Sequence, residues 1–495
     1  MTAMSHFKNK TVLQILEYYK NLWALGYVAG VAHWDLETYM PEKGAGARGE
    51  ALAKISSLRQ KMFLDKSFVD LIHKAQKQKG LTDAEKGVVR HLLRALTIYE
   101  KLPAKFIEEF ELLTNKATVT WRKAKDTNNF KLFEPQLTKI FEMNRKSAEY
   151  IGYKGSPYDA LLDQFEEDLT AKEVESFFTT IKSPLMEILT SIKSSKKYKK
   201  DHVLETTTYD KIKIEELNNK ILKLFWEDMS RFRLDVSSHP FTTSFSNNDT
   251  RITTWYHKTD FARSLLATIH EFGHALYDLQ SADGLEMTPV AGGSSLVIHE
   301  SQSRFWENFV GRSVPFIKHF KKDFESAVGK SLSTDEIYTY FNKVSPSLLR
   351  VEADEVTYHF HIMLRFEIEK GMIEGKLKAR DLPEIWNTKM KEYLGVVPKT
   401  DSEGLLQDIH WSGGMVGYFP TYSMGTFLGA QWEQKLGTEL KNLELTKIKN
   451  WLGKNIHQYG STYTMPELLK KNKMKFDPSV NLDYLRNKYG KIYEF

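Results

Sequence analysis

The sequence has no cysteine, little net charge and no long apolar run, and each absence excludes a class of protein. Without cysteine, the 495-residue chain can form neither a disulfide framework nor a thiolate metal site. Any bound metal must therefore be held by nitrogen and oxygen atoms. The formal net charge of +6 is small for this length and favours neither a nucleic-acid nor a membrane partner. No apolar run approaches the roughly 18 residues that are needed to span a bilayer.

Segments that would divide or target the chain are also scarce. The first residues, MTAMSHFKNK, lack an apolar core with a small-residue cleavage site, so we expect no signal peptide and a cytoplasmic location. No stretch is rich enough in proline, glycine or serine to indicate a linker. The lysine-rich segment 191–202 has no apolar periodicity and is typical of an exposed loop, a helix end or a hinge. We therefore expect residues 1–495 to form a single domain, which could consist of two helical lobes.

Most of the remaining sequence has the apolar spacing of helices. Thr82 with Glu85 three residues later predicts a capping box, after which apolar residues recur every three or four positions. Residues 232–256 differ, because they are rich in threonine, serine, valine and aromatic residues, with Asn and Asp at turns. They predict a small antiparallel β-sheet directly before the next helix. The expected fold class is therefore mainly α, with a small antiparallel β-sheet.

The helix that follows this region contains the stretch TIHEFGHALYD, residues 268–278. Because a helix turns about 100° per residue, His270 and His274 lie one turn apart on one face and can bind the same metal ion. Glu271 points to the side of that ion and can accept a proton from a metal-bound water. Single histidines are more often core or surface residues than ligands, so the pattern requires a third ligand. Glu300 is the candidate, and it completes the two-His, one-Glu set of thermolysin-type (gluzincin) zinc sites.

At this point the chain resembles a known family, the metallocarboxypeptidases of the carboxypeptidase Taq type. The resemblance rests on motifs in order along nearly the full length: HWDLETYMPEKGAGAR (33–48), HPF (239–241), DTRIT (249–253), HEFGH (270–274), HESQ (299–302), LRVEAD (349–354) and GLLQDIHW (404–411). It implies a large elongated helical fold with a deep groove, removal of C-terminal residues from peptides, one divalent metal ion per chain and a homodimer. Zinc is the expected ion, although cobalt or manganese also suits this ligand set.

The resemblance also implies how the substrate is recognised. Arg350 is expected to bind the C-terminal carboxylate, since a guanidinium can donate two parallel hydrogen bonds to it. The sequence alone equally allows a structural salt bridge from Arg350 to Glu352 or Asp354. His239 is expected to line the cleft.

The segment IHWSGGMVGYFPTYSMG supplies the expected donors for the oxyanion of the reaction. By similarity to helical zinc peptidases of the thimet oligopeptidase type, these are His410, Tyr418 and Tyr422, with Tyr418 slightly preferred over Tyr422. Four further residues are expected to support the site rather than to touch substrate: Asp249, Arg251, Gln407 and Asp408.

Three functions remain open from the sequence. The first is a metal-dependent carboxypeptidase in which Glu271 activates a metal-bound water. The second is an endo-acting zinc oligopeptidase of the same helical class, and the third is a non-catalytic helical scaffold that binds metal. Glu271 argues against the third, because a structural site tends to fill all four positions with protein ligands and has no use for a base.

Overall fold

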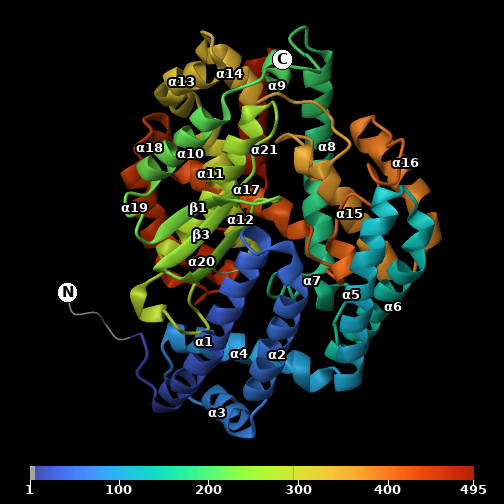
Figure 1. Ribbon diagram of the computed structural model, residues 1–495, viewed down its shortest axis with the longest axis vertical. Helices are drawn as coiled ribbons and strands as arrows, with labels where there is room; N and C mark the ends of the chain where they lie inside the picture. Colours follow the sequence, from blue (N-terminus) through green and yellow to red (C-terminus); the bar gives the residue numbers. More distant parts are fainter. Residues whose placement is uncertain (1–5, 294) are drawn as a thin grey trace. The chain divides into compact units, whose positions relative to one another are not determined.

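The structure is a computed structural model that describes residues 6–293 and 295–495. Helices make up most of it (Figure 1). The chain divides into two compact units, each assembled from three stretches of sequence. Unit 1 comprises Met1–Leu96, as far as it is described, with Val203–Phe341 and Trp432–Phe476. Unit 2 comprises Thr97–His202, Asn342–Gln431 and Asp477–Phe495.

Unit 1 contains a small sheet and most of the helices. Its α-helices are α1 (Lys10–Thr38), α2 (Ala45–Phe63), α3 (Lys66–Gln76), α4 (Asp83–Lys101, which ends in unit 2), α9 (Val203–Thr206), α10 (Lys211–Phe225), α11 (Phe261–Leu279), α12 (Leu296–Arg304), α13 (Val314–Val328), α14 (Thr334–Phe341), α18 (Gly437–Lys441), α19 (Leu445–Asn455) and α20 (Met465–Lys471). Its strands are β1 (Phe232–Val236), β2 (Thr242–Ser246) and β3 (Asp249–Thr254). Its shorter turns are η1 (Glu42–Gly44), η3 (Asp283–Leu285), the π-helix η4 (Phe305–Gly311) and η8 (His457–Tyr459).

Unit 2 is built from helices and short helical turns. Its α-helices are α5 (Ala104–Asp126), α6 (Glu134–Ile151), α7 (Asp159–Leu162), α8 (Ala171–Ser194), α15 (Tyr358–Ile373), α16 (Leu382–Leu394), α17 (Pro420–Lys435, which ends in unit 1) and α21 (Ser479–Tyr493). Its turns are η2 (Phe130–Leu132), η5 (Arg350–Glu352), η6 (Ala379–Asp381) and η7 (His410–Gly413). The lysine-rich segment 191–202 contains the end of α8 and a turn that reaches the boundary with the next stretch of unit 1.

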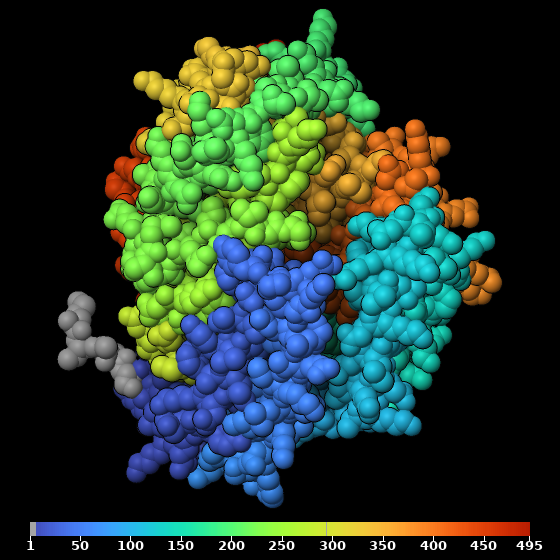
Figure 2. Space-filling model, in the orientation of Figure 1, coloured from blue at the N-terminus to red at the C-terminus, as the bar shows by residue number. Residues whose placement is uncertain are grey.

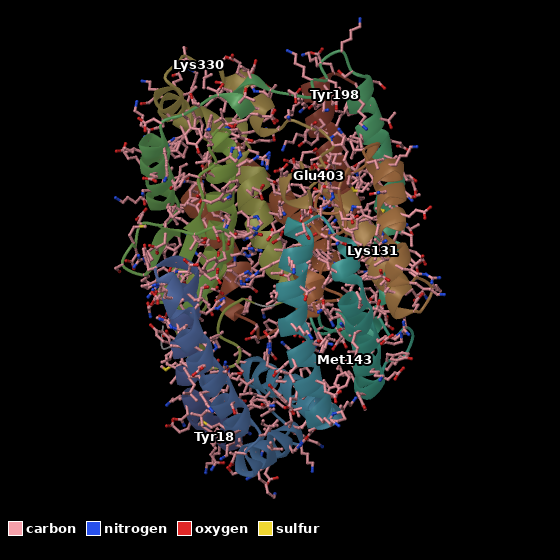
Figure 3. The ribbon with its side chains drawn as sticks, turned by 45° about the vertical axis from the view of Figure 1, so that its right-hand side comes forward. Tyr18, Lys131, Met143, Tyr198, Lys330 and Glu403 are labelled. Atoms are coloured by element: carbon pink, nitrogen blue, oxygen red, sulfur yellow. The ribbon has the colours of Figure 1, made fainter. Side chains whose placement is uncertain are left out.

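A local sequence signal accounts for the start of α4, and a contact between aromatic rings joins α1 to α3. The Thr82 hydroxyl accepts the Glu85 N–H at 3.2 Å, and the Glu85 carboxylate accepts the Thr82 N–H at 2.8 Å. The predicted capping box is therefore present. Tyr18 of α1 stacks on Phe68 of α3 with ring centroids 4.5 Å apart; Tyr18 is labelled in Figure 3.

The sheet differs from the prediction in one pairing. Strands β2 and β3 are antiparallel as expected, but β1 pairs with β3 in parallel, and the strand order is β1-β3-β2. The segment between β1 and β2 crosses the end of β3, where the Phe241 N–H donates to the Thr253 hydroxyl at 3.0 Å. Because β3 returns from a tight turn and inserts between the other two strands, it runs in the direction of β1. A wholly antiparallel sheet was therefore the wrong prediction.

Helix α11 lies at the centre of unit 1 and packs against β2, β3, α10, α12 and η4. Four of its apolar side chains face the core and are buried: Leu266, Ile269, Phe272 and Leu276. The Phe272 ring lies 5.2 Å from that of Phe225 and 5.1 Å from that of Trp306. Burial on nearly every side holds this helix rigidly, which suits it to present side chains with fixed geometry.

Helix α2, in the same unit, lies on the surface, in contrast to the buried helix α11. None of its residues is buried, and Figure 2 shows its side chains on the surface of the blue part of the molecule. Among the described residues, no helix combines the length and apolar character needed to cross a membrane.

Helix α15 occupies the core of unit 2. Its apolar side chains are buried, as is Met143 of α6, which Figure 3 labels. Two charged side chains of α15, Arg365 and Glu369, are also fully buried and lie one helical turn apart. Charged side chains are almost never fully buried unless they have partners, so these two positions need an explanation.

Candidate functional site

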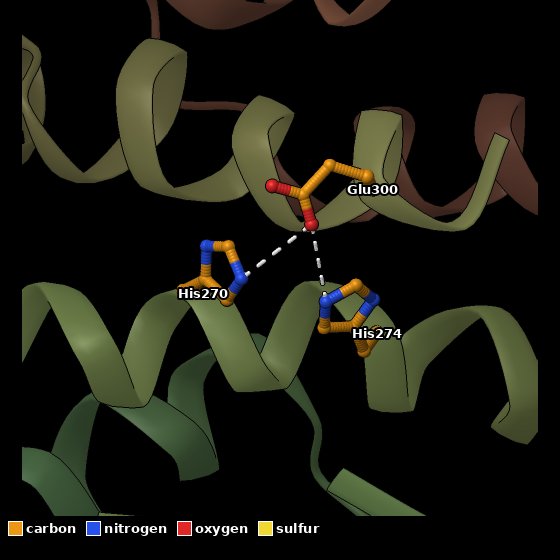
Figure 4. A group of neighbouring side chains, drawn as sticks. All are labelled: His270, His274 and Glu300. Carbon is orange, nitrogen blue, oxygen red and sulfur yellow. Dashed lines mark ion pairs between the residues drawn. The ribbon is translucent and has the colours of Figure 1, made fainter. Parts of the chain in front are cut away.

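Helices α11 and α12 bring together the three expected metal ligands (Figure 4). Glu300 Oε2 lies 3.7 Å from His270 Nε2 and 3.5 Å from His274 Nε2. The three ligand atoms all lie within 4.8 Å of one another. Two ligands of a tetrahedral zinc ion, each at about 2.0–2.1 Å, are about 3.3–3.5 Å apart. The spacing of the three side chains therefore matches a single ion held by two nitrogen atoms and one oxygen atom.

Gly273 explains how the two helices approach so closely. A Cβ atom at this position would lie 2.5 Å from the Gln302 carbonyl oxygen and 2.5 Å from the Ser303 Cα atom. Any larger residue between the two histidines would push α12 away from α11. The glycine of HEFGH is therefore required for Glu300 to reach the histidine pair.

The second ring nitrogen of His270 is held by a carboxylate. His270 Nδ1 lies 3.0 Å from Glu307 Oε2 in the π-helix η4. Arg304 and Arg312 donate to the two oxygens of Glu307 at 3.0 and 2.8 Å. Because Nδ1–H donates to this carboxylate, Nε2 keeps its lone pair for the metal ion.

The second ring nitrogen of His274 is held by another histidine. His274 Nδ1 and His299 Nδ1 are 2.7 Å apart, so one of these atoms must carry the proton. A His274 that binds metal through Nε2 must be the donor, which leaves the proton of His299 on Nε2, 3.7 Å from Asp278 Oδ1. Sequence reasoning missed Glu307, His299 and Asp278, although His299 stands directly before Glu300 in the HESQ motif.

Charges around the three side chains suit a cation. Burial raises the pKa of Glu300, but the positive charges of Arg304 and His270 outweigh it and hold that pKa well below its ordinary value. Burial likewise lowers the pKa of His274. Both effects keep the ligand atoms of Glu300 and His274 deprotonated, as metal binding requires. At His270, burial lowers the pKa, but the charge of Glu300 and the hydrogen bond to Glu307 outweigh burial and raise it.

Glu271 is held from the sheet. Its side chain is 8% exposed, and Thr242 of β2 donates to Glu271 Oε2 at 2.6 Å. The same hydroxyl lies 3.0 Å from the Glu271 carbonyl oxygen. Sequence reasoning also missed Thr242, because nothing in the local pattern of β2 points to the helix that follows β3.

In unit 2, Arg350 is paired with Asp408. Its Nη2 and Nε atoms donate to Asp408 Oδ1 at 2.8 and 3.1 Å, and its Nη1 atom lies 3.3 Å from the Tyr358 hydroxyl. Arg365 donates to the other oxygen of Asp408 through Nε at 2.8 Å. Burial by itself would raise the pKa of Asp408. The positive charges of Arg350 and Arg365 have the larger effect and hold that pKa below its ordinary value, so the carboxylate is ionised.

The alternative partner for Arg350 is occupied elsewhere. Asp354 accepts the N–H groups of Ser345, Val356 and Thr357 at 2.9–3.0 Å. The alternative of a salt bridge from Arg350 to Asp354 is therefore not what the structure has, and the structural partner of Arg350 is Asp408, 58 residues further along the chain.

The three expected oxyanion donors lie together in unit 2. The Tyr422 hydroxyl is 3.5 Å from His410 Nε2, and the Arg350 guanidinium lies 5.2 Å above the Tyr422 ring. The Tyr418 ring is 5.5 Å from the His410 ring and 5.1 Å from that of Tyr422.

The remaining expected residues lie around the sheet of unit 1 and beside Arg350. His239 is exposed in the segment that crosses β3, with Nδ1 2.9 Å from the Pro240 carbonyl oxygen. Arg251 donates to both oxygens of Asp249 at 2.8 Å. Gln407 accepts the Arg350 N–H at 2.8 Å.

Comparison with known proteins identifies the family. Residues 14–489 match the family model described as carboxypeptidase Taq (M32) metallopeptidase. The chain belongs to this family. It is 44% identical over 475 residues to thermostable carboxypeptidase 1 of Pyrococcus furiosus, with 94% of this chain and 95% of that protein covered. It is 35% identical over 475 residues to carboxypeptidase 1 of Bacillus subtilis, with 93% and 94% covered.

A solved structure of Pyrococcus furiosus carboxypeptidase has the same fold as this M32 chain. The TM-score is 0.94 at 43% identity, and 98% of this chain and 99% of that one are covered. These matches confirm the expected family, the mainly helical fold class and the metallocarboxypeptidase activity. An M32 metallopeptidase implies a divalent metal ion, and the spacing and charge of the two-His, one-Glu group fit such an ion.

Proposed function

We propose that this M32 metallopeptidase hydrolyses the C-terminal peptide bond of peptides, with His270, His274 and Glu300 holding the divalent ion. The observation that carries the proposal is that one atom from each of these three side chains lies within 4.8 Å of the others. Glu271 lies on α11 together with the two histidines. When bound, the ion would polarise the scissile carbonyl and lower the pKa of a water molecule to about 7.

Glu271 is proposed as the general base, which accepts a proton from the attacking water and later donates it to the leaving amine. Support comes from its position between the two histidines and from Thr242, whose hydroxyl donates at 2.6 Å and so orients the carboxylate. The hydrogen bond uses one oxygen, Oε2, and leaves Oε1 for the water.

Arg350 is proposed to bind the free C-terminal carboxylate of the substrate. An arginine has five N–H donors. Within the described part of the chain, its hydrogen bonds to Asp408 and Tyr358 use three of them, through Nε, Nη2 and Nη1. One N–H on each Nη atom remains, and two such donors suit a carboxylate. His239 is proposed as a second contact with substrate.

His410, Tyr418 and Tyr422 are proposed to stabilise the oxyanion of the tetrahedral intermediate by hydrogen bonds. The 3.5 Å separation between Tyr422 and His410 supports joint action of this pair, and the preference for Tyr418 stays a prediction. Zinc is the proposed ion, and the homodimer is proposed from family resemblance. The cytoplasmic location likewise stays a prediction.

The decisive experiment is to incubate the metal-loaded protein with a mixed peptide pool and to identify products by mass spectrometry. A carboxypeptidase releases single residues from the C-terminus, and amidated peptides of the same sequences are poor substrates. Internal fragments would instead support the alternative, an endo-acting oligopeptidase with the same metal chemistry. A sample stripped of metal, verified by elemental analysis, is the control.

A further inference from the structure

Glu369 of α15 is a fully buried carboxylate that the proposed chemistry does not use. It accepts three hydrogen bonds: from Trp411 Nε1 to Oε1 at 2.6 Å, from the Gly417 N–H to Oε2 at 2.9 Å and from the Tyr158 hydroxyl to Oε2 at 2.5 Å. Arg365, one turn earlier on the same helix, donates to Asp408. Helix α15 therefore holds one chain segment, 408–417, at three points.

Two of the donors to Glu369 are direct neighbours of proposed oxyanion donors. Trp411 follows His410, and Gly417 precedes Tyr418. A single carboxylate thus fixes the residue next to each of these two side chains. Arg365 and Asp408 fix the chain on the other side of His410, with Asp408 Oδ1 3.9 Å from His410 Nδ1.

The local sequence of segment 408–417 does not favour a single backbone conformation. It contains Gly413, Gly414 and Gly417, and glycine loses more conformational freedom on folding than any other residue. Gly414 and Gly417 have φ values of 79° and 102°. A Cβ atom on Gly417 would lie 2.8 Å from the Leu161 carbonyl carbon, so the backbone packs directly against helix α7.

The carboxylate is a costly choice for a purely structural anchor. Its three hydrogen bonds, from Tyr158, Trp411 and Gly417, all come from neutral donors. Burial raises the pKa of Glu369 to about 7, against the opposing effect of the hydrogen bonds from Tyr158 and Trp411. A buried carboxylate without a directly bonded cation is less stable than a well-packed neutral group, so stability alone does not account for Glu369 at this position.

We propose that Glu369 is a positioning residue for the reaction, which sets the orientation of His410 and Tyr418 by holding Trp411 and Gly417. This inference rests on the proposed function, in which His410 and Tyr418 donate to the oxyanion. Donors to an oxyanion must be placed within tenths of an ångström, so loosening the segment should impair the chemical step more than it impairs ground-state binding of substrate.

The test compares Glu369→Gln with Glu355→Gln, a matched control in the same unit. Glu355 is also buried, but Lys488 and Tyr489, which donate to it at 2.6 and 2.8 Å, belong to α21 and not to segment 408–417. Glu369→Gln should lower kcat about 10- to 100-fold while KM changes less than about threefold, since removing one whole oxyanion donor costs about 100- to 1,000-fold. Glu355→Gln should lower the melting temperature without lowering kcat.

A second comparison separates positioning from general damage. In the His410→Ala/Tyr418→Phe background, adding Glu369→Gln should cost less than about threefold further in kcat, because its targets are already gone. Multiplicative losses would overturn the proposal, as would wild-type kcat in the single variant. If Glu369→Gln does not fold, Trp411→Phe replaces it in both comparisons, since that change removes the donor and leaves the carboxylate.

Different results would refute the proposed oxyanion roles of His410 and Tyr418 and the proposed positioning role of Glu369. Full activity of the His410→Ala/Tyr418→Phe variant would refute the proposed oxyanion roles, whatever Glu369 does. Impaired activity of that variant together with unchanged kcat in Glu369→Gln would refute only the positioning role.

Discussion

Gly273→Ala should weaken metal binding although it adds only a single uncharged methyl group. The new Cβ atom would lie 2.5 Å from backbone atoms of Gln302 and Ser303, and this contact must open by about 0.9 Å to reach an ordinary 3.4 Å. Because the obstacles are backbone atoms of α12, no side chain can rotate away. Such overpacking typically costs about 1–3 kcal/mol of stability.

The same displacement acts on the metal ligands. Glu300 sits on α12 and the two histidines on α11, and their 3.5 and 3.7 Å separations already match a tetrahedral ion. Moving α12 outward by most of an ångström takes the carboxylate out of bonding distance unless the helix distorts. Changes outside the ligand set cost about 10- to 100-fold in affinity, so we expect a loss of at least about 100-fold here.

The assay is zinc competition with a chromophoric chelator, together with the melting temperature of the metal-free protein. Gly49→Ala in α2 is the control, because its Cβ would meet no atom within 4 Å. In a helix this change should stabilise the protein by up to about 1 kcal/mol and leave zinc affinity unchanged. Wild-type zinc affinity in folded Gly273→Ala would refute the idea that close helix packing sets the site.

Four further predictions follow from the same contacts. Glu271→Gln should keep the metal but lower kcat by about 100- to 10,000-fold, because the general base is lost; a variant with a tenth of wild-type kcat would rule out that role. Dialysis against a strong chelator should abolish activity, which zinc or cobalt should restore, whereas full turnover by verified metal-free protein would contradict the metal requirement. Glu307→Ala should weaken zinc affinity about 10- to 100-fold, with Glu307→Gln between it and the wild type; unchanged affinity in both would show that the 3.0 Å contact with His270 has no effect. Arg350→Ala should lower kcat/KM for a free-acid peptide by roughly ten- to several-hundred-fold and barely affect the amidated peptide. Equal losses on both peptides would make Arg350 structural, acting through its bond to Asp408.

The three candidate metal ligands could be picked out from the sequence because two of them obey a local rule. His270 and His274 are one turn apart on any helix, and the rule that catalytic zinc takes three protein ligands then directs the search to Glu300. The capping box at Thr82 was predictable for the same reason, since donor and acceptor are three residues apart. Ordered motifs along the chain added the family, and with it the fold and the activity.

Contacts between distant segments were not predictable in this way. Asp354 is the local partner that the sequence offers to Arg350, yet Asp408 holds the guanidinium. Likewise, β1 was expected to pair antiparallel, but β3 inserts between β1 and β2. In both cases the winning arrangement depends on which segments the rest of the fold brings together.

The sequence by itself therefore determined the helical class, the family and the three candidate metal ligands, because helix periodicity and motif spacing act over a few residues. Only the tertiary structure decided what holds those candidates: Glu307 and His299 on the two histidines, and Thr242 on Glu271. It also decided that Glu369 anchors the segment between His410 and Tyr418. A hydrogen bond needs its two atoms within about 3 Å, and for side chains far apart in sequence only the packing of whole elements sets that distance.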